Sequence, residues 1–190
     1  MDSKTRGRVR RGAAWMAVAA ATFGVFLTPR LATATAAPVP PEVPQEIAVP
    51  AGNELYGMGS AEGFQIYICQ SQGTGFGWAL QQPMAVLAGG GHKAFALHYG
   101  GPTWMALDGS AVVGTRTGLA PAPDAGAIPW LKLSASPASG STTGVLSGTT
   151  FIQRVNTTGG VAPATGCDAE HVGATAPVPY TADYYFYRAG

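Results

Sequence analysis

The chain has 190 residues, with 11 Lys and Arg residues against 10 Asp and Glu residues, and its formal net charge is +1. Six of the eleven bases lie in the first thirty residues, and from Ala37 onward five bases stand against nine acids, a difference of −4. This mildly acidic, sparsely charged body argues against a nucleic-acid-binding protein, which needs basic patches to neutralise phosphates, and against a salt-bridged helical bundle.

The N-terminus has the pattern of a secretory signal peptide over residues 1–36. A basic segment precedes the uncharged run Ala13–Leu27, and small residues at Ala34 and Ala36 follow. Cleavage is expected after Ala36 or Ala37. An uncleaved signal anchor is the alternative, but the run is shorter than the roughly 20 apolar residues of a membrane span. We therefore expect a secreted or cell-envelope-associated protein with no membrane span after cleavage.

The rest of the chain divides into a Pro-rich leader, residues 37–46, and a single β domain, residues 47–190. Short β-branched and aromatic runs separated by Gly and Pro predict an all-β fold, an antiparallel β-sandwich or barrel of about ten short strands with long loops. The candidate strands, in chain order, are Glu46–Val49, Glu54–Ser60, Phe64–Gln70, Phe76–Gln82, Met84–Ala88, His92–Tyr99, Thr103–Leu107, Ala111–Thr117, Trp130–Ala135, Thr149–Asn156 and Tyr180–Tyr187. Helical periodicity is nearly absent, and Lys93–Leu97, the best helical candidate, fits a strand at least as well.

Three connections between these strands are long, namely Gly118–Pro129, Ser136–Gly148 and Thr157–Pro179. Unstructured loops of that length in a small domain are usually functional or tethered. Cys69 and Cys167 are the only cysteines, and an exported chain favours their pairing as a disulfide, which would tether the third connection to a strand. Two independent thiols, one of them reactive, are the alternative.

Several phrases along residues 47–188 recur together in one known family. They are VPAGNELY (49–56), GFQIYIC (63–69), HYGGPTW (98–104), DGSAVVG (108–114), AIPWLKL (127–133), FIQRVNTTGGVAPATGCD (151–168) and VPYTADYYFY (178–187). In this order they resemble a family of secreted bacterial and fungal proteins known chiefly as a domain of unknown function. The resemblance implies no activity.

Some fungal members of that family carry the label malate dehydrogenase, which the residues do not support. A nicotinamide enzyme needs a G-x-G-x-x-G turn between a strand and a helix. The nearest string, Gly73–Trp78, has tryptophan in place of the third glycine and runs on into a strand-like segment. We expect no cofactor.

The segment His98–Trp104 is the most suggestive for function, because a Gly-Gly-Pro turn joins two strands between a histidine and a tryptophan. His98 is a candidate general base or ligand-binding donor. A histidine that is only hydrogen-bonded within the sheet is the structural alternative. Trp104 and Asp108 are further candidates for ligand binding.

The strand that ends in Gln153, Arg154 and Asn156 supplies the remaining candidates. Arg154 is one of five bases after residue 36, so it is a candidate clamp for a ligand carboxylate. An internal ion pair of Arg154 with an aspartate of the body is the alternative. The candidate partners are Asp108, Asp168 and Asp183.

Other chemistry has weak support in the sequence. Either a sugar-stacking platform or, more simply, a core is formed by the aromatic residues Trp78, Trp104, Trp130, Tyr180, Tyr184, Tyr185, Phe186 and Tyr187. The three histidines, His92, His98 and His171, show no metal-ligand spacing, so we expect no metal site. No G-x-S-x-G nucleophile motif occurs.

Two classes of function therefore remain. The first is a secreted protein that binds a small molecule, a glycan or a partner protein around His98, Trp104 and Arg154. The second is an extracellular hydrolase or isomerase that uses His98 with Asp108 or Asp168 as an acid–base pair. Binding is the preferred prediction, because the sequence places no acid–base pair or nucleophile.

Overall fold

A computed structural model describes residues 38–138 and 141–190, so the predicted signal peptide lies outside the described residues. The described part is all-β, with two short 3-10 helices, η1 (Gln45–Ile47) and η2 (Gly90–His92). The strands are β1 (Asn53–Gln72), β2 (Gly75–Ala88), β3 (Ala94–Tyr99), β4 (Thr103–Ala106), β5 (Ala111–Ala120), β6 (Trp130–Pro137), β7 (Thr149–Gly159) and β8 (Thr175–Ala189). No helix in these ranges has the length and hydropathy that a membrane crossing requires.

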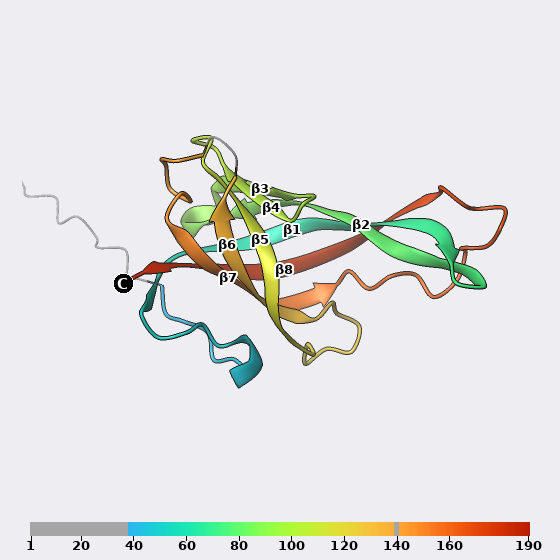
Figure 1. The fold of residues 1–190 in the computed structure, drawn as a ribbon, viewed down its shortest axis with the longest axis horizontal. Coiled ribbons are helices and arrows are strands. Elements are labelled where there is room, and N and C mark those ends of the chain that lie inside the picture. Colours follow the sequence, from blue (N-terminus) through green and yellow to red (C-terminus); the bar gives the residue numbers. More distant parts are fainter. Residues whose placement is uncertain (1–37, 139–140) are drawn as a thin grey trace, which may run out of the picture. The chain divides into compact units, whose positions relative to one another are not determined.

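The strands form one closed antiparallel barrel (Figure 1). Each strand pairs with the next, and β8 returns to pair with β1 over a register that runs from Asn53↔Ala189 to Ile68↔Thr175. This confirms the all-β prediction, with a barrel rather than two separate sheets. Closure leaves the barrel without a free sheet edge, which is how such folds avoid pairing with other chains.

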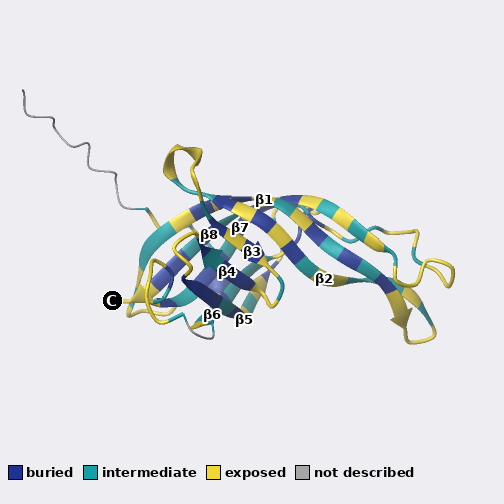
Figure 2. Cartoon of the chain, turned by 90° about the horizontal axis from the view of Figure 1, so that it is seen from above, coloured by how far each residue is buried: buried dark blue, intermediate teal, exposed yellow. Residues whose placement is uncertain are grey.

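The inner and outer faces follow the two-residue period of the sequence. Along β1 the side chains of Gln65, Tyr67 and Cys69 are buried, whereas Glu62 and Phe64 are exposed. Figure 2 shows this alternation as dark and light bands along β1 and β2. The buried side chains pack into one core inside the barrel. Its large members include Trp104, Tyr184, Phe186, Leu87 and Ile152.

Eight strands replace the eleven candidates. Glu54–Ser60 and Phe64–Gln70 merge into β1, and Phe76–Gln82 merges with Met84–Ala88 into β2. Pro83 lies inside β2, beside the register shift between Ile66 and Tyr67 of β1, and an irregular position of this kind tolerates a residue without a backbone N–H. β1 therefore continues through residues 61–63 without a register shift, whereas β2 continues through Pro83 beside one.

The predicted strand Glu46–Val49 is wrong, because Gln45–Ile47 forms the 3-10 helix η1. Ile47 is fully buried and packs with Ala120 and Val155 on the outside of the barrel wall. Its carbonyl oxygen accepts a hydrogen bond of 2.7 Å from Gln153 Nε2. The segment that precedes β1 is thus fastened to the outer face of β5–β7.

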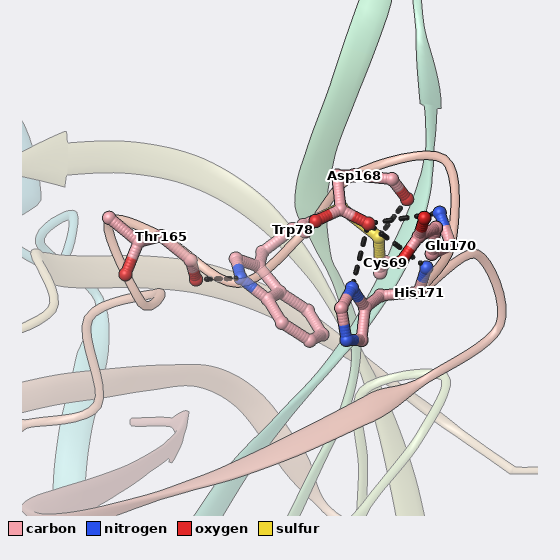
Figure 3. The surroundings of a disulfide bond; sticks show 7 residues. Cys69, Trp78, Thr165, Asp168, Glu170 and His171 are labelled. Atoms are coloured by element: carbon pink, nitrogen blue, oxygen red, sulfur yellow. Dashed lines mark hydrogen bonds and ion pairs between the residues drawn. A yellow bond between two sulfur atoms is a disulfide. The ribbon is translucent and has the colours of Figure 1, made fainter.

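The β1–β2 hairpin continues beyond the barrel as an arm, residues 66–82, which reaches to the right in Figure 1. The β7–β8 connection runs beside this arm. The disulfide between Cys69 and Cys167 joins the two, with Cα atoms 5.3 Å apart, and confirms the predicted pairing (Figure 3). Trp78 Nε1 donates to the Thr165 carbonyl at 2.8 Å, a second link between the arm and the connection.

Candidate functional site

A pocket of about 250 Å³ is lined by residues from all eight strands of the barrel, including Leu80, which lies on the arm. Its volume is slightly below the roughly 300–1,000 Å³ of pockets for drug-sized ligands. The lining residues are Gln65, Leu80, Pro83, His98, Pro102, Trp104, Gly114, Arg116, Leu131, Leu133, Arg154 and Tyr184. Most of them are apolar, and none is acidic.

Three aromatic rings form one side of the pocket. His98 and Trp104 are directly opposite each other on β3 and β4, and their rings stack with centroids 4.2 Å apart. Tyr184 meets both rings edge-on, at 5.2 Å from His98 and 5.5 Å from Trp104. The Gly-Gly-Pro turn that was singled out in the sequence produces this arrangement, because it brings β3 and β4 into register and places Pro102 at the pocket.

His98 is a neutral side chain at physiological pH. Burial lowers the pKa of His98 to about 3, and the nearby charge of Arg154 adds to this effect against the opposing hydrogen bond with Thr103. With the ring neutral, Nδ1 donates to the Thr103 carbonyl oxygen at 2.9 Å, so Nε2 carries the lone pair. An imidazole with so low a pKa is a weak base, which does not suit it to proton abstraction near pH 7.

Arg154 forms no ion pair with an acid of the described chain, so the predicted internal pairing is wrong. Its Nε and Nη2 donate to the Pro129 carbonyl oxygen at 3.3 and 2.7 Å. The three proposed partners are engaged elsewhere. Asp183 accepts hydrogen bonds from Ser60 and Asn156, Asp168 lies beside His171, and Asp108 binds the 144–146 turn.

Two further polar groups in the pocket wall lack a partner. Gln65 Nε2 and Trp104 Nε1 are buried, and neither donates a hydrogen bond to any described residue. A buried donor without an acceptor costs about 1–3 kcal/mol. Both residues line the pocket, although the two nitrogen atoms are themselves buried.

Three of the six predicted binding residues do not reach the pocket. The Gln153 side chain is buried away from the pocket. Its Oε1 accepts a hydrogen bond of 2.6 Å from the Tyr187 hydroxyl, and its Nε2 donates to the Ile47 carbonyl oxygen. Asn156 has a positive φ of 52° and donates to Asp183 Oδ2 at 2.9 Å. Asp108 accepts from the Ser110 hydroxyl and from the Val145 N–H, which fastens the β4–β5 turn to a loop.

The acid–base pairs proposed for a hydrolase or isomerase are not formed in the described structure. Asp108 and Asp168 are not among the residues that line the pocket with His98. Asp168 instead lies 2.7 Å from His171 Nδ1 on an exposed loop, beside the disulfide (Figure 3). The hydrogen bond from His171 keeps the pKa of Asp168 below its usual value.

The sequence interpretation missed several residues of the pocket, among them Gln65, Arg116, Leu131, Leu133 and, as a site residue, Tyr184. Gln65 carried a usable signal, because it is a polar residue on the face of β1 that Tyr67 and Cys69 turn inward. The two leucines and Arg116 carried none, since their relation to His98 depends on barrel closure.

The family model for a protein of unknown function (DUF3455) matches residues 50–188 of the chain. The chain belongs to this family. The match covers all eight strands of the barrel apart from the last residue of β8, and therefore the entire lining of the pocket. No curated protein and no solved structure matches the chain. Any function of this DUF3455 member must therefore be argued from the site.

The malate dehydrogenase label is inconsistent with the fold of this DUF3455 member. All strand pairs in residues 38–138 and 141–190 are antiparallel, whereas dinucleotide binding of that kind requires parallel strands joined by helices. The glycine string Gly73–Gly77 belongs to the turn and first residues of the β1–β2 hairpin. It precedes a strand and not a helix.

Proposed function

We propose that this DUF3455 member is exported and binds one small molecule inside its barrel, held by His98, Trp104 and Arg154. The observation that carries the proposal is a pocket lined by all eight strands that contains an arginine without an acidic partner. Binding sites commonly combine apolar walls with a few polar groups that orient the ligand. This pocket has that composition.

The size and lining of the pocket favour a small molecule over the glycan or protein partner that the sequence also allowed. A volume of about 250 Å³ inside a barrel admits no protein segment of useful size. Four of its twelve lining residues, Leu80, Pro83, Leu131 and Leu133, offer no hydrogen bonds to sugar hydroxyls. A compact and partly apolar ligand fits these walls best.

Export is supported by two independent features. The first 36 residues have the pattern of a cleavable signal, and the disulfide Cys69–Cys167 is compatible with an oxidising, extracellular location. A barrel cross-linked by a disulfide is suited to carry or sequester a ligand outside the cytoplasm or in the cell envelope.

The test is native mass spectrometry of the exported protein after gentle purification, followed by thermal-shift screening of small metabolites. A bound or newly found ligand should raise the melting temperature of the wild type. Leu131→Trp, which fills the pocket, should abolish that shift. Leu107→Trp makes the same exchange at an exposed position in the β4–β5 turn and should leave it intact.

Two results would contradict the proposal. One is a ligand that binds Leu131→Trp and the wild type equally, because it would then occupy another site. The other is the absence of both a copurified molecule and any thermal shift across the screen.

A further inference from the structure

We infer that the pocket takes an anionic ligand, a small monocarboxylate with an apolar aromatic or branched body. This inference rests on the proposed binding function and specifies the ligand class. The supporting observation is that two arginines, Arg116 and Arg154, line the same pocket, while no Asp or Glu does. The ligand would supply the missing negative charge.

The two arginines come from strands on either side of β6. Arg116 of β5 is opposite Leu133, and Arg154 of β7 is opposite Leu131. Leu131 and Leu133 are two residues apart on β6, so their side chains point the same way, and both line the pocket. The register therefore brings both guanidinium groups to the same side of the pocket.

Neither of these two cations pairs with an acid among the described residues, in a domain that has few cations. Residues 37–190 carry five bases, and in the described part Arg188 pairs with Glu54 while Lys132 donates to the Ala48 carbonyl. Arg116 makes no hydrogen bond or ion pair with any described residue, and the Arg154 guanidinium, which donates to the Pro129 carbonyl oxygen through Nε and Nη2, has no acidic partner among them. Guanidinium groups remain charged at every physiological pH and bind carboxylates with good geometry.

The remaining groups define the body of the ligand. Trp104, Leu131, Leu133 and Pro83 offer apolar surface, and Trp104 adds a flat ring against which an aromatic or branched group can pack. His98 is neutral, so the positive charge of the pocket comes from Arg116 and Arg154. An acid with a strongly polar body would lose hydrogen bonds against these walls.

The experiment is isothermal titration calorimetry of the exported protein with phenylacetate as the aromatic probe and isovalerate as the branched probe. Phenylacetamide and phenethylammonium serve as the neutral and cationic counterparts of the first. We expect at least one acid to bind, phenylacetamide to bind at least tenfold more weakly than phenylacetate, and phenethylammonium to give no heat. Binding of the acid should also weaken as the salt concentration rises.

Three arginine variants make the assignment specific. Arg154→Met should weaken binding of the acid at least tenfold, and Arg116→Met, at a more exposed position, at least threefold. Arg188→Met removes a cation outside the pocket and should bind as the wild type does. Because Arg154 also holds the Pro129 carbonyl, Arg116→Met keeps the test valid if Arg154→Met is poorly folded.

The anionic class is overturned if neither acid binds at millimolar concentration, or if phenylacetamide binds as tightly as phenylacetate. It is also overturned if Arg116→Met and Arg154→Met bind the acid as Arg188→Met does. Tighter binding of phenylphosphonate than of phenylacetate would contradict the assignment of a carboxylate as the anionic group of the ligand. A neutral molecule that binds the wild type but not Leu131→Trp would contradict the inference that the ligand is an anion. The proposed binding of a small molecule in the pocket would still hold.

Discussion

The imidazole of His98 lies almost parallel to the indole of Trp104, with an interplanar angle of 11° and centroids 4.2 Å apart. The two residues face each other across β3 and β4, so the stack is a cross-strand pair inside the barrel. The same contact buries His98 and leaves it uncharged. Its first consequence is a dependence of stability on pH.

His98 should make the fold less stable as the pH falls. Its pKa is about 3 in the folded protein and close to the ordinary histidine value of 6.5 when the chain is unfolded, so between these values the unfolded chain binds the extra proton. The free energy of unfolding therefore decreases as pH falls from 6.5 towards 3, by at most ~5 kcal/mol, and is unaffected by His98 above 6.5. Urea denaturation at several pH values measures this loss.

The matched variant is His98→Phe, which keeps a ring beside Trp104 and cannot be protonated. Its free energy of unfolding should fall less steeply between pH 6.5 and 4 than that of the wild type. The carboxylates titrate in both proteins, so the difference between the two slopes isolates His98. Parallel curves would show that His98 does not carry this pH dependence.

Local patterns in the sequence predicted much of the fold but not how the barrel closes. Alternating residues and Gly or Pro turns predicted β3 to β8, with bounds within a few residues of those in the structure. The segment His98–Trp104 predicted part of the pocket lining. Tyr184 was missed as a site residue because β8 pairs with β1, more than a hundred residues earlier in the chain. Sequence periodicity gives the face of a strand but not its neighbour.

The errors at Asp108 and Gln153 have a different physical origin. Both are polar residues near the ends of strands, a pattern that suits a binding site as well as a structural hydrogen bond. In the fold each satisfies distant backbone groups, Asp108 the N–H of Val145 and Gln153 the carbonyl of Ile47. Val145 lies in a loop and Ile47 in the 3-10 helix η1 and not in the predicted strand Glu46–Val49, so neither contact follows from strand pairing.

Ile47 should be essential to stability although it precedes the first strand. It is fully buried against Ala120 and Val155, so Ile47→Ala should lower the free energy of unfolding by about 2–4 kcal/mol. Val39→Ala removes a similar side chain from a position that is 78% exposed and should cost less than about 0.5 kcal/mol. Chemical denaturation of both variants gives the comparison, and equal losses would mean that η1 does not brace the barrel.

The disulfide should stabilise both the whole domain and the arm. Its cysteines are 98 positions apart, and replacement of both by serine should lower the free energy of unfolding by about 2–4 kcal/mol. Without it, the 160–174 connection is held to the arm by hydrogen bonds from Trp78 Nε1 to Thr165 and from the Tyr67 hydroxyl to Gly160, and by the backbone bonds of Cys69 with Gly173 and Ala174. Limited proteolysis of the double variant should cut first within 160–174. Cleavage first elsewhere would contradict this role.

Two buried glutamines provide a direct test of the unpaired donors in the pocket. Gln65 and Gln153 are both 1% exposed, but Gln153 binds Ile47 and Tyr187 whereas Gln65 Nε2 has no described partner. Gln153→Met leaves a buried carbonyl and a buried hydroxyl without their partner and should lower the free energy of unfolding by about 2–4 kcal/mol. Gln65→Met removes an unsatisfied donor and should change it by less than about 1 kcal/mol.

The same pair separates stability from binding. If Gln65 Nε2 serves a ligand, Gln65→Met should weaken the binding of phenylacetate several-fold while the ligand-free protein stays as stable as the wild type. Denaturation without ligand and titration with it give the two measurements on one sample. A loss of stability equal to that of Gln153→Met would show that Gln65 is a structural residue, and unchanged binding would remove it from the site.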